Sequence, residues 1–422
     1  MAKITNIKGR QVFDSRGNPT VEAEVYSDDG YYSSAIVPSG ASTGRHEAFE
    51  LRDKENKDYL GKGVLSSVKN INLTISKKLK NFNIFDQAKI DETLIDLDGT
   101  QQKKKLGANS ILAVSIATSK LAAISKKIPL FKYLGGATSN KIPLPLMNII
   151  NGGVHANNSL RIQEFMIRPE KPKTFSEATR ICFLVIQKLK SLINNKNLST
   201  TVGDEGGFAP SLNTNEKAIE LIIEAIEKAG FKPGTDLSIC LDIASNELYK
   251  DGKYSVQSLK FENAKSTIDY YLKLVDKYPI KSIEDPFSED DWASWASFMR
   301  LLKFNKTNTQ IVGDDLFVTN KKRLNRGIKE ETANAILIKP NQIGTLTETI
   351  EVINLAHKNG FKTIISHRSG DSEDTFIADL AVATNSSQIK TGSLARSERV
   401  AKYNRLLRIE EELGKHAKMA NI

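Results

Sequence analysis

The chain has 422 residues, of which 40% are hydrophobic and 26% are charged, and its formal net charge is +10. These values are ordinary for a soluble globular protein and leave room for two or three domains, one of which can be a large barrel. No apolar run approaches the roughly 18 residues of a membrane span and the first residues lack a signal-peptide pattern, so we expect a cytoplasmic protein without membrane partners.

The positive charge has two readings, a nucleic-acid surface or a lysine-rich solvated face. We favour the second reading because the lysines are scattered, and neither an aromatic-basic alternation nor a phosphate or dinucleotide loop accompanies them. Cys182 and Cys240 both lie in apolar strings, which favours buried thiols over a disulfide or a metal pair.

The first part of the chain reads as a small α+β domain over residues 1–135. Residues 21–25 alternate between apolar and polar, and a turn at residues 28–30 leads into a second strand over residues 31–37, which predicts an antiparallel meander. Apolar residues then recur at helical spacing between Val64 and Leu79, and residues 108–124 are mostly good helix formers.

The loop over residues 38–47 is rich in Gly and Ser. It is either an ordinary surface loop or a lid over the mouth of the second domain, and its hydroxyl and carbonyl oxygens could ligate a hard metal.

Residues 136–422 read as an α/β domain with a (β/α) barrel. The clearest strand covers residues 335–338, which are apolar and lead into Lys339 before Pro and Asn break the pattern. Other short strands end in the same way, with helical stretches between them, at Asp242, Glu284, Asp314, His367 and Lys390. Charged residues at successive strand ends are typical of the catalytic face of such a barrel.

Asp242, Glu284 and Asp314 together would give a cluster of hard oxygen ligands suited to Mg²⁺. Any one of them alone is more often a helix cap or half of a salt bridge. Lys339 could act as a base beside such cations, form a Schiff base, or pair with an acid, and the neighbouring acids favour metal-assisted proton abstraction.

Several longer motifs carry a family resemblance. They are residues 14–20 (DSRGNPT), the loop at 38–47, residues 148–153, 163–166 (QEFM), 203–210 (GDEGGFAP), 366–370 (SHRSG) and 390–392 (KTG). In this order, from Ile4 to about Leu413, the chain resembles the enolases, the phosphopyruvate hydratases.

The resemblance implies an enolase-type barrel with a smaller N-terminal domain, acting in glycolysis and gluconeogenesis. The implied reaction is the reversible dehydration of 2-phosphoglycerate to phosphoenolpyruvate. It also implies a homodimer or a higher homo-oligomer, and a secondary presence at the cell surface.

The resemblance also assigns roles to residues. Two Mg²⁺ ions would bind, the first held by Asp242, Glu284 and Asp314, and the second joining with substrate and with Ser42. Lys339 would be the base and Glu205 the general acid, assisted by Glu164 with His155 nearby. Arg368 and Ser369 would bind the phosphate, and Lys390 and Gln163 would orient the substrate.

Val154, Asn157 and Arg161 depart from the pattern common in many bacterial enolases, in which Asp is common at positions 157 and 161 and an acid or Ala is common at position 154. None of them is a proposed ligand, but they change the charge expected beside the site.

Two rival functions remain to be weighed. One is a related barrel enzyme acting on another carboxylate, which the motif at 366–370 disfavours. The other is a non-catalytic binding protein, which the intact Glu205, Lys339 and metal acids disfavour.

Overall fold

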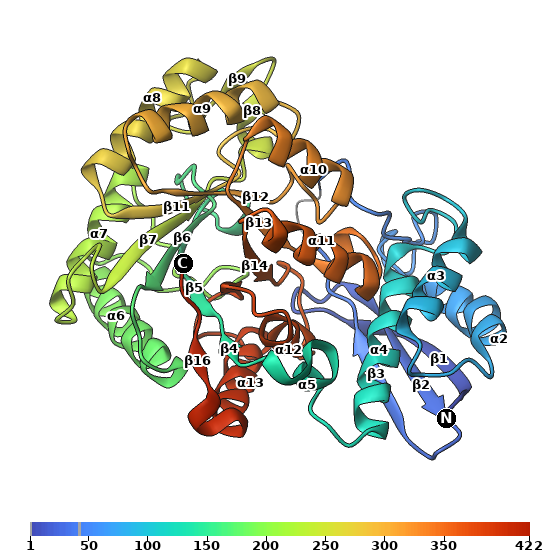
Figure 1. Ribbon diagram of the computed structural model, residues 1–422. Helices are drawn as coiled ribbons and strands as arrows, with labels where there is room; N and C mark the ends of the chain where they lie inside the picture. Colours follow the sequence, from blue (N-terminus) through green and yellow to red (C-terminus); the bar gives the residue numbers. More distant parts are fainter. Residues whose placement is uncertain (1, 41–43) are drawn as a thin grey trace.

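The computed structural model describes residues 2–40 and 44–422, and it consists of a smaller N-terminal part and a barrel (Figure 1). The N-terminal part starts with an antiparallel sheet of β1 (Ile4–Phe13), β2 (Pro19–Ser27) and β3 (Tyr32–Ile36). The predicted meander is confirmed, and β1 is an additional strand that the alternation did not reveal. Val21, Ala23 and Val25 of β2 are fully buried, because every second residue of the strand faces the helices.

Helices pack against this sheet. The stretch with apolar residues at helical spacing forms α1 (Leu65–Lys69), a π-helical segment η1 (Asn70–Ile75) and α2 (Ser76–Leu79). Val64, Ile71, Ile75 and Leu79 are buried as the spacing predicts, whereas Leu65 is 48% exposed. The helices α3 (Gln87–Asp98), α4 (Ala108–Ser125) and α5 (Leu130–Gly135) follow.

Helix α4 corrects one sequence-based expectation. It has 18 residues and is apolar enough, by length and composition, to cross a membrane, although no such run was expected. However, 83% of this helix is buried inside the protein, where it packs against β2, β3, α3 and α5. A core helix passes the same test, so α4 is weak evidence for a membrane span.

Eight strands close the barrel. In order around it they are β11 (Ile280–Glu284), β12 (Gln310–Gly313), β13 (Ala335–Ile338), β14 (Lys362–Ser366), β15 (Gln388–Lys390), β5 (Leu144–Asn151), β6 (Glu164–Pro169) and β7 (Leu237–Asp242). The outer helices are α6 (Phe175–Asn195), α7 (Asn215–Lys228), α8 (Ala264–Lys277), α9 (Trp292–Phe304), α10 (Lys321–Glu330), α11 (Leu346–Lys358), α12 (Phe376–Ala383) and α13 (Ser397–Leu413). The expected α/β barrel with a smaller α+β part is confirmed.

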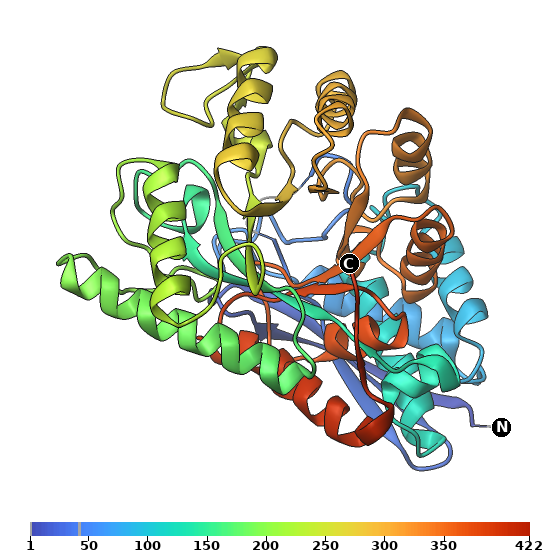
Figure 2. The ribbon, with the colours of Figure 1, turned by 60° about the vertical axis from the view of Figure 1, so that its left-hand side comes forward.

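Short elements complete the chain. They are β4 (Lys141–Ile142), which pairs with β16 (Lys418–Met419), a small sheet of β8 (Tyr249–Lys250), β9 (Lys253–Tyr254) and β10 (Glu262–Asn263), and single helical turns at η2 (Gly136–Thr138), η3 (Gly153–His155), η4 (Ser245–Leu248), η5 (Pro340–Gln342) and η6 (Gly414–His416). The longest helix, α6, lies beside α13 along one side of the barrel (Figure 2).

Threonine caps define where several barrel helices begin. Thr174, Thr214 and Thr345 each accept a backbone N–H in the first turn of α6, α7 and α11. At α11 the Thr345 hydroxyl also lies 2.7 Å from Glu348 Oε2. Such caps satisfy backbone donors that the helix itself leaves free, and they fix the start of the helix after each loop.

Strand β6 runs against its neighbours, unlike the other strands of the barrel. It pairs antiparallel with both β5 and β7, whereas the remaining pairs are parallel. The connection over residues 152–163 contains no crossover helix, and a parallel return would need one. The first residue of β6, Glu164, therefore lies at the same end of the barrel as the last residues of the other strands.

The barrel interior is filled in layers. One is apolar and consists of Leu146, Met166, Cys240, Val312, Ala335, Leu337 and Ile364. Another, nearer the strand starts, is polar, and Gln310 and Gln388 hydrogen bond to each other at 2.8 Å with Arg168 bonded to Gln388 at 3.1 Å. Packing of this kind fills the barrel below the end at which the carboxylates gather.

Ion pairs and hydrogen bonds fasten the N-terminal part over the barrel mouth. Lys120 bonds Asp374 at 2.6 Å, and Asp91 accepts the backbone N–H of Thr347 at 2.9 Å. Ser39 and Gly370 exchange two backbone hydrogen bonds of 2.8 and 2.9 Å. A Cβ at Gly370 would lie 2.4 Å from Asp14 Oδ2, so this close approach requires glycine.

The two cysteines, Cys182 and Cys240, are free and fully buried, as expected. Burial raises the pKa of both thiols, that of Cys240 to about 11. Neither thiol is therefore a reactive thiolate near neutral pH.

Replacing Leu337 by Ala tests the interior packing. Leu337 is fully buried in the apolar layer, so we expect the substitution to destabilise the protein by about 2–5 kcal/mol through the cavity it leaves. Urea unfolding measures the change, with Leu73→Ala as control because Leu73 is 60% exposed. Equal effects of the two substitutions would contradict the packing described.

Candidate active site

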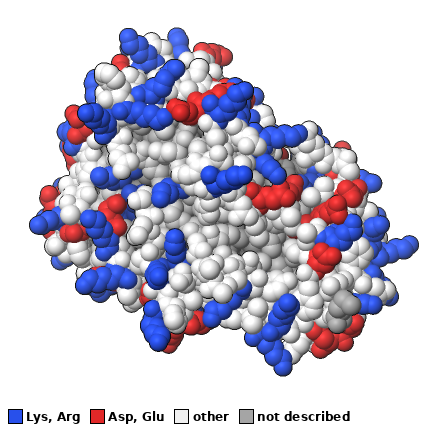
Figure 3. All heavy atoms as spheres, in the orientation of Figure 1, with Lys and Arg blue, Asp and Glu red and all other residues white. Residues whose placement is uncertain are grey.

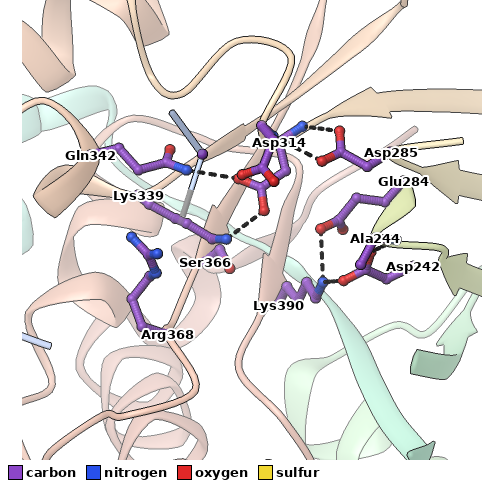
Figure 4. Close-up of polar contacts among 12 residues, drawn as sticks. Asp242, Ala244, Glu284, Asp285, Asp314, Lys339, Gln342, Ser366, Arg368 and Lys390 are labelled. Atoms are coloured by element: carbon purple, nitrogen blue, oxygen red, sulfur yellow. Dashed lines mark hydrogen bonds and ion pairs between the residues drawn. The ribbon is translucent and has the colours of Figure 1, made fainter. Parts of the chain in front are cut away.

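Three carboxylates meet where β6, β7 and β11 lie side by side. Glu164 is directly opposite Asp242, and Asp242 is directly opposite Glu284. Lys390, from the end of β15, reaches all three: its Nζ lies 2.7 Å from Asp242, 2.9 Å from Glu284 and 3.2 Å from Glu164. Figure 4 shows the lysine pointing between Asp242 and Glu284. Sheet register alone thus brings together acids that are far apart in sequence.

Asp314 lies in a second group, after β12. Its Oδ2 is 2.5 Å from Lys339 Nζ, and its Oδ1 accepts a hydrogen bond of 2.9 Å from Gln342 (Figure 4). Asp285 accepts the backbone N–H groups of Asp314 and Asp315, both at 2.9 Å. One set of carboxylates close enough to share an ion is therefore Asp285, Asp314 and Asp315.

The three predicted metal ligands are divided between these two groups. Asp242 and Glu284 converge on Lys390, whereas Asp314 bonds Lys339. Asp285 and Asp315 were not singled out as site residues. Each directly follows, in the sequence, an acid that was expected at a strand end. These pairs of adjacent acids were the sequence feature that could have identified Asp285 and Asp315.

Negative charge exceeds positive charge in the cavity. Among the described residues, its lining holds six carboxylic groups (Glu164, Glu205, Asp242, Asp285, Asp314 and Asp315) and three strongly basic groups (Lys339, Arg368 and Lys390). Burial and the charge of Asp242 raise the pKa of Glu284 well above its ordinary value. For Asp315, burial and the charge of Asp314 raise the pKa to about 8. The site therefore favours binding of further positive charge.

Orphaned oxygens indicate that this positive charge fits a hard metal ion. Oε2 of Glu164 and Oε2 of Glu284 are buried and accept no hydrogen bond from the part of the chain that the structure describes. A buried carboxylate oxygen without a partner is costly, and Mg²⁺ takes such oxygens as ligands. The donor set is thus compatible with a divalent cation.

Lys339 and Asp314 stabilise each other's charged forms. Burial lowers the pKa of Lys339, but Asp314 raises it, and the net shift is upward. Burial raises the pKa of Asp314, but Lys339 lowers it, and the net shift is downward. As an isolated pair they form a salt bridge, which was one of the alternatives open for Lys339.

Glu205 lies between two histidines on the other side of the cavity. Its Oε2 is 3.4 Å from His367 Nε2, 3.8 Å from His155 Nδ1 and 3.4 Å from Asn148 Nδ2. The same His155 nitrogen is 3.8 Å from Glu164 Oε1. His155, Glu164 and Glu205 form a second set of groups that lie close together.

Glu164 and Glu205 differ in their affinity for a proton. Burial and the charge of Glu205 raise the pKa of Glu164 well above its ordinary value. Burial alone would raise the pKa of Glu205 too, but His367 and His155 lower it well below its ordinary value. The pKa shifts of this pair therefore have opposite directions, upward for Glu164 and downward for Glu205.

Arg368 points into the cavity from the segment after β14 (Figure 4). Both of its terminal nitrogens bond the carboxylate of Glu47, at 3.0 and 3.1 Å, and Nη1 also lies 3.1 Å from Asn341 Oδ1. Ser369 and Gln163 line the same cavity, and Gln163 Nε2 is 3.5 Å from Asp242 Oδ2. Glu47 was not singled out as an individual residue, although it ends the loop suspected to be a lid.

Ser42, the remaining predicted ligand, lies outside the described residues. The loop on either side of it is held to the barrel. Arg45 bonds Glu289 at 2.7 Å and Asp290 at 2.6 Å, and Ser39 pairs with Gly370.

The three residues that depart from the common pattern lie beside the cavity rather than in it. Arg161 donates to the carbonyl and hydroxyl oxygens of Ser255 at 2.9 and 2.8 Å. Val154 is 51% exposed, and Asn157 is also exposed. Their side chains do not line the cavity that contains Lys339 and Glu205.

The surface agrees with the solvated reading of the net charge on the face that Figure 3 shows. Lys and Arg side chains are spread over it and alternate with Asp and Glu. They do not gather into a single basic patch on this face.

Fold and site together define a barrel enzyme whose buried cavity combines a carboxylate cluster with groups able to take and give protons. A family model described as the enolase C-terminal TIM barrel domain matches residues 139–422, and one described as the enolase N-terminal domain matches residues 4–134. An enolase from Pelagibacter ubique (strain HTCC1062) is 64% identical over 422 residues, which is 100% of both chains. The chain therefore belongs to the enolase family, the phosphopyruvate hydratases, which are lyases.

Proposed function

We propose that this enzyme dehydrates 2-phosphoglycerate reversibly to phosphoenolpyruvate, as a step of glycolysis and gluconeogenesis. The observation that carries the proposal is the placement of Lys339 and Glu205 in one buried cavity that has an excess of carboxylates between and around them. A lysine and a carboxylic group in one cavity are what removal of a proton and departure of hydroxide require.

Substrate binding would use the cationic groups of the lining. The planar guanidinium of Arg368 suits a phosphate, which would replace the carboxylate of Glu47, and Ser369 would add a hydrogen bond. Lys390 and Gln163 would orient the substrate beside the acids that they contact. These roles place the C2–H bond toward Lys339 and the hydroxyl on C3 toward Glu205.

Asp242, Glu284 and Asp314 are proposed to hold a first Mg²⁺, and a second is proposed to join with substrate and Ser42. Bound Mg²⁺ would stabilise the doubly charged carboxylate that forms when the C2 proton leaves, and would engage the Asp314 carboxylate that now bonds Lys339. Asp285 and Asp315 lie close enough to Asp314 to contribute negative charge to the proposed metal site.

Lys339 is proposed as the base. Its Nζ is buried, which favours the neutral amine, whereas the ion pair with Asp314 and the charge of Asp315 favour the ammonium form and raise the pKa of Lys339. With Asp314 engaged elsewhere, the neutral amine would take the proton from C2.

Glu205 is proposed as the acid that protonates the leaving hydroxyl, so that water departs. The pKa of Glu164 is raised and that of Glu205 is lowered, so Glu164 would assist as a neighbouring proton store: Glu205 would give its own proton to the leaving hydroxyl, and a proton from Glu164 would then restore Glu205.

Family membership also supports three coarser proposals: a cytoplasmic location, a homodimer or larger homo-oligomer, and a division of the chain into a capping domain at 1–135 and a catalytic barrel at 136–422. Sedimentation of the purified chain measures the oligomeric state directly.

Metal dependence is the first test of the reaction. Chelation should abolish turnover and added Mg²⁺ should restore it, because the buried acids need the added charge. Asp314→Asn should weaken Mg²⁺ binding in a calorimetric titration, whereas Asp379→Asn, which removes a buried acid paired with Arg405 outside the site, should not. Full activity in excess chelator would rule out the metal-assisted mechanism.

The base is tested by Lys339→Ala. We expect both dehydration and exchange of the C2 proton with solvent to fall by about 10²–10⁴-fold, the usual contribution of a positioned base. Lys281→Ala is the control, since Lys281 lies on β11 but does not line the cavity. Exchange at the normal rate in Lys339→Ala would assign the base to another residue.

The acid is tested by Glu205→Gln, which keeps size and hydrogen bonding but cannot readily donate a proton. Dehydration should be blocked while C2 exchange in deuterated water survives measurably, because Lys339 remains. Glu170→Gln serves as control, since Glu170 follows β6 at the opposite end of the barrel and bonds Arg168. If exchange is lost as completely as in Lys339→Ala, Glu205 is more than an acid, and if dehydration is normal, it is not needed.

A further inference from the structure

Arg399, in the first turn of α13, connects the segments that carry the acid and the phosphate-binding residues. Its side chain is completely buried. Nη1 lies 2.6 Å from His367 Nδ1 and 2.6 Å from the carbonyl oxygen of Arg368. Nη2 lies 2.6 Å from the carbonyl oxygen of Ser369 and 3.2 Å from that of Asp204. No sequence pattern had marked this arginine.

The contact with His367 determines where the imidazole proton lies. A guanidinium carries only donors, so the His367 Nδ1 that it contacts must present a lone pair. A doubly protonated ring would place two donors against each other at 2.6 Å. His367 is therefore neutral, and its one ring proton is on Nε2.

The electrostatics of the pocket agree with a neutral ring. Burial lowers the pKa of His367 to about 4, with Glu205 opposing and Arg399 adding to the effect. Asp371, the other acid that faces this ring, also opposes the shift. The ring is thus uncharged at neutral pH.

Nε2 of His367 lies near the acid. It is 3.4 Å from Glu205 Oε2, but among the described residues it makes no hydrogen bond, so the contact seen here is electrostatic. The Nε2–H tautomer offers Glu205 a donor, whereas the Nδ1–H tautomer would present a lone pair to the carboxylate and repel it.

We propose that Arg399 is a positioning residue that fixes the Nε2–H tautomer of His367 and thereby orients Glu205 for its proton transfer. This inference rests on the proposed function, because it gives Arg399 a part in the step assigned to Glu205. Arg399 itself contacts neither the substrate-binding side chain of Arg368 nor the carboxylate of Glu205 in any hydrogen bond of the described residues, and acts through His367 and three backbone carbonyls.

The stem of Arg399 packs closely against the turn at Gly392. A Cβ at Gly392, whose φ is +74°, would lie 2.9 Å from Arg399 Cδ and 2.5 Å from the carbonyl oxygen of Glu205. The same carbonyl accepts the backbone N–H of Ser393 at 2.9 Å. The loop of Glu205, the turn at Gly392 and the arginine stem are thus in direct contact, which transmits the position of Arg399 to Glu205.

The test is a measurement of the tautomer by ¹⁵N NMR of histidine-labelled full-length protein. The chain has only five histidines, and the spectrum of His367→Gln assigns the signal of His367. We expect a protonated Nε2 and an unprotonated Nδ1 between pH 6 and 8. A protonated Nδ1 in the unaltered protein would overturn the proposal, and this arm needs no folded variant of Arg399.

Arg399→Lys provides the second arm, since it keeps the charge but loses the fork of donors. We expect the His367 signals to shift toward a mixture of tautomers. Dehydration should fall on the order of tenfold to a hundredfold, as is usual for loss of a residue that orients a catalytic group, and C2 exchange should fall less. An unchanged tautomer in folded Arg399→Lys would also overturn the proposal.

Lys402→Met is the matched control. Lys402 lies one turn further along α13 and is equally buried, but it bonds Asp371 at 2.6 Å and the carbonyl oxygens of Ser372 and Glu398 instead. Its substitution should disturb stability without changing the tautomer, and a tautomer change there would show that any buried charge on the helix has the same effect. If the unaltered protein does not dehydrate 2-phosphoglycerate, the proposed function fails while the NMR result still decides the tautomer.

Discussion

The structure depends most on the way in which buried negative charge is held at the mouth of the barrel. Burying carboxylates is costly unless each is paired. Register between β6, β7 and β11 forces Glu164, Asp242 and Glu284 into adjacent positions, so they cannot avoid one another. Lys390 comes from β15, which is opposite β11 in the closed order of strands, and contacts all three acids across the barrel. Lys390 thus holds the acids together, yet two of their oxygens accept no hydrogen bond from residues 2–40 or 44–422, which leaves the site able to bind a cation.

Sequence patterns predicted the strand ends well because a parallel strand places its last residue at a fixed end of the barrel. Asp242, Glu284, Lys339 and Lys390 could be located from apolar runs that stop at a charge. The direction of β6 could not, since alternation and hydrophobicity do not depend on chain direction. The sequence also did not determine that Lys339 pairs with Asp314, because this ion pair depends on the distance between side chains that follow two neighbouring strands.

Residues that act from loops or helices were harder to find. Glu47 belongs to a loop that was suspected, but its partner Arg368 is more than three hundred positions away and no local pattern joins them. Arg399 lies in the amphipathic helix α13, whose sequence pattern does not distinguish this buried arginine from an exposed one. The predicted metal ligands lie in two groups for a related reason: β12 extends only to Gly313, so Asp314 lies beyond the strand, where it bonds Lys339.

The proposed base and the proposed acid receive their positions in different ways. Lys339 directly follows β13, so the barrel fixes its backbone, and its side chain contacts Asp314, which follows the neighbouring strand β12. Glu205 lies outside the named strands, on a long connection between α6 and α7 that is bridged to β5 at Phe208. The described contacts of its carboxylate are those of His367, His155 and Asn148. Of these, His367 is the one whose own ring is fixed by a charged donor, and that donor also bonds the carbonyl before Glu205. In the proposed mechanism, an acid carried on a loop thus depends on the C-terminal helix α13, which lies far from it in sequence, for the positioning that a strand gives to the proposed base.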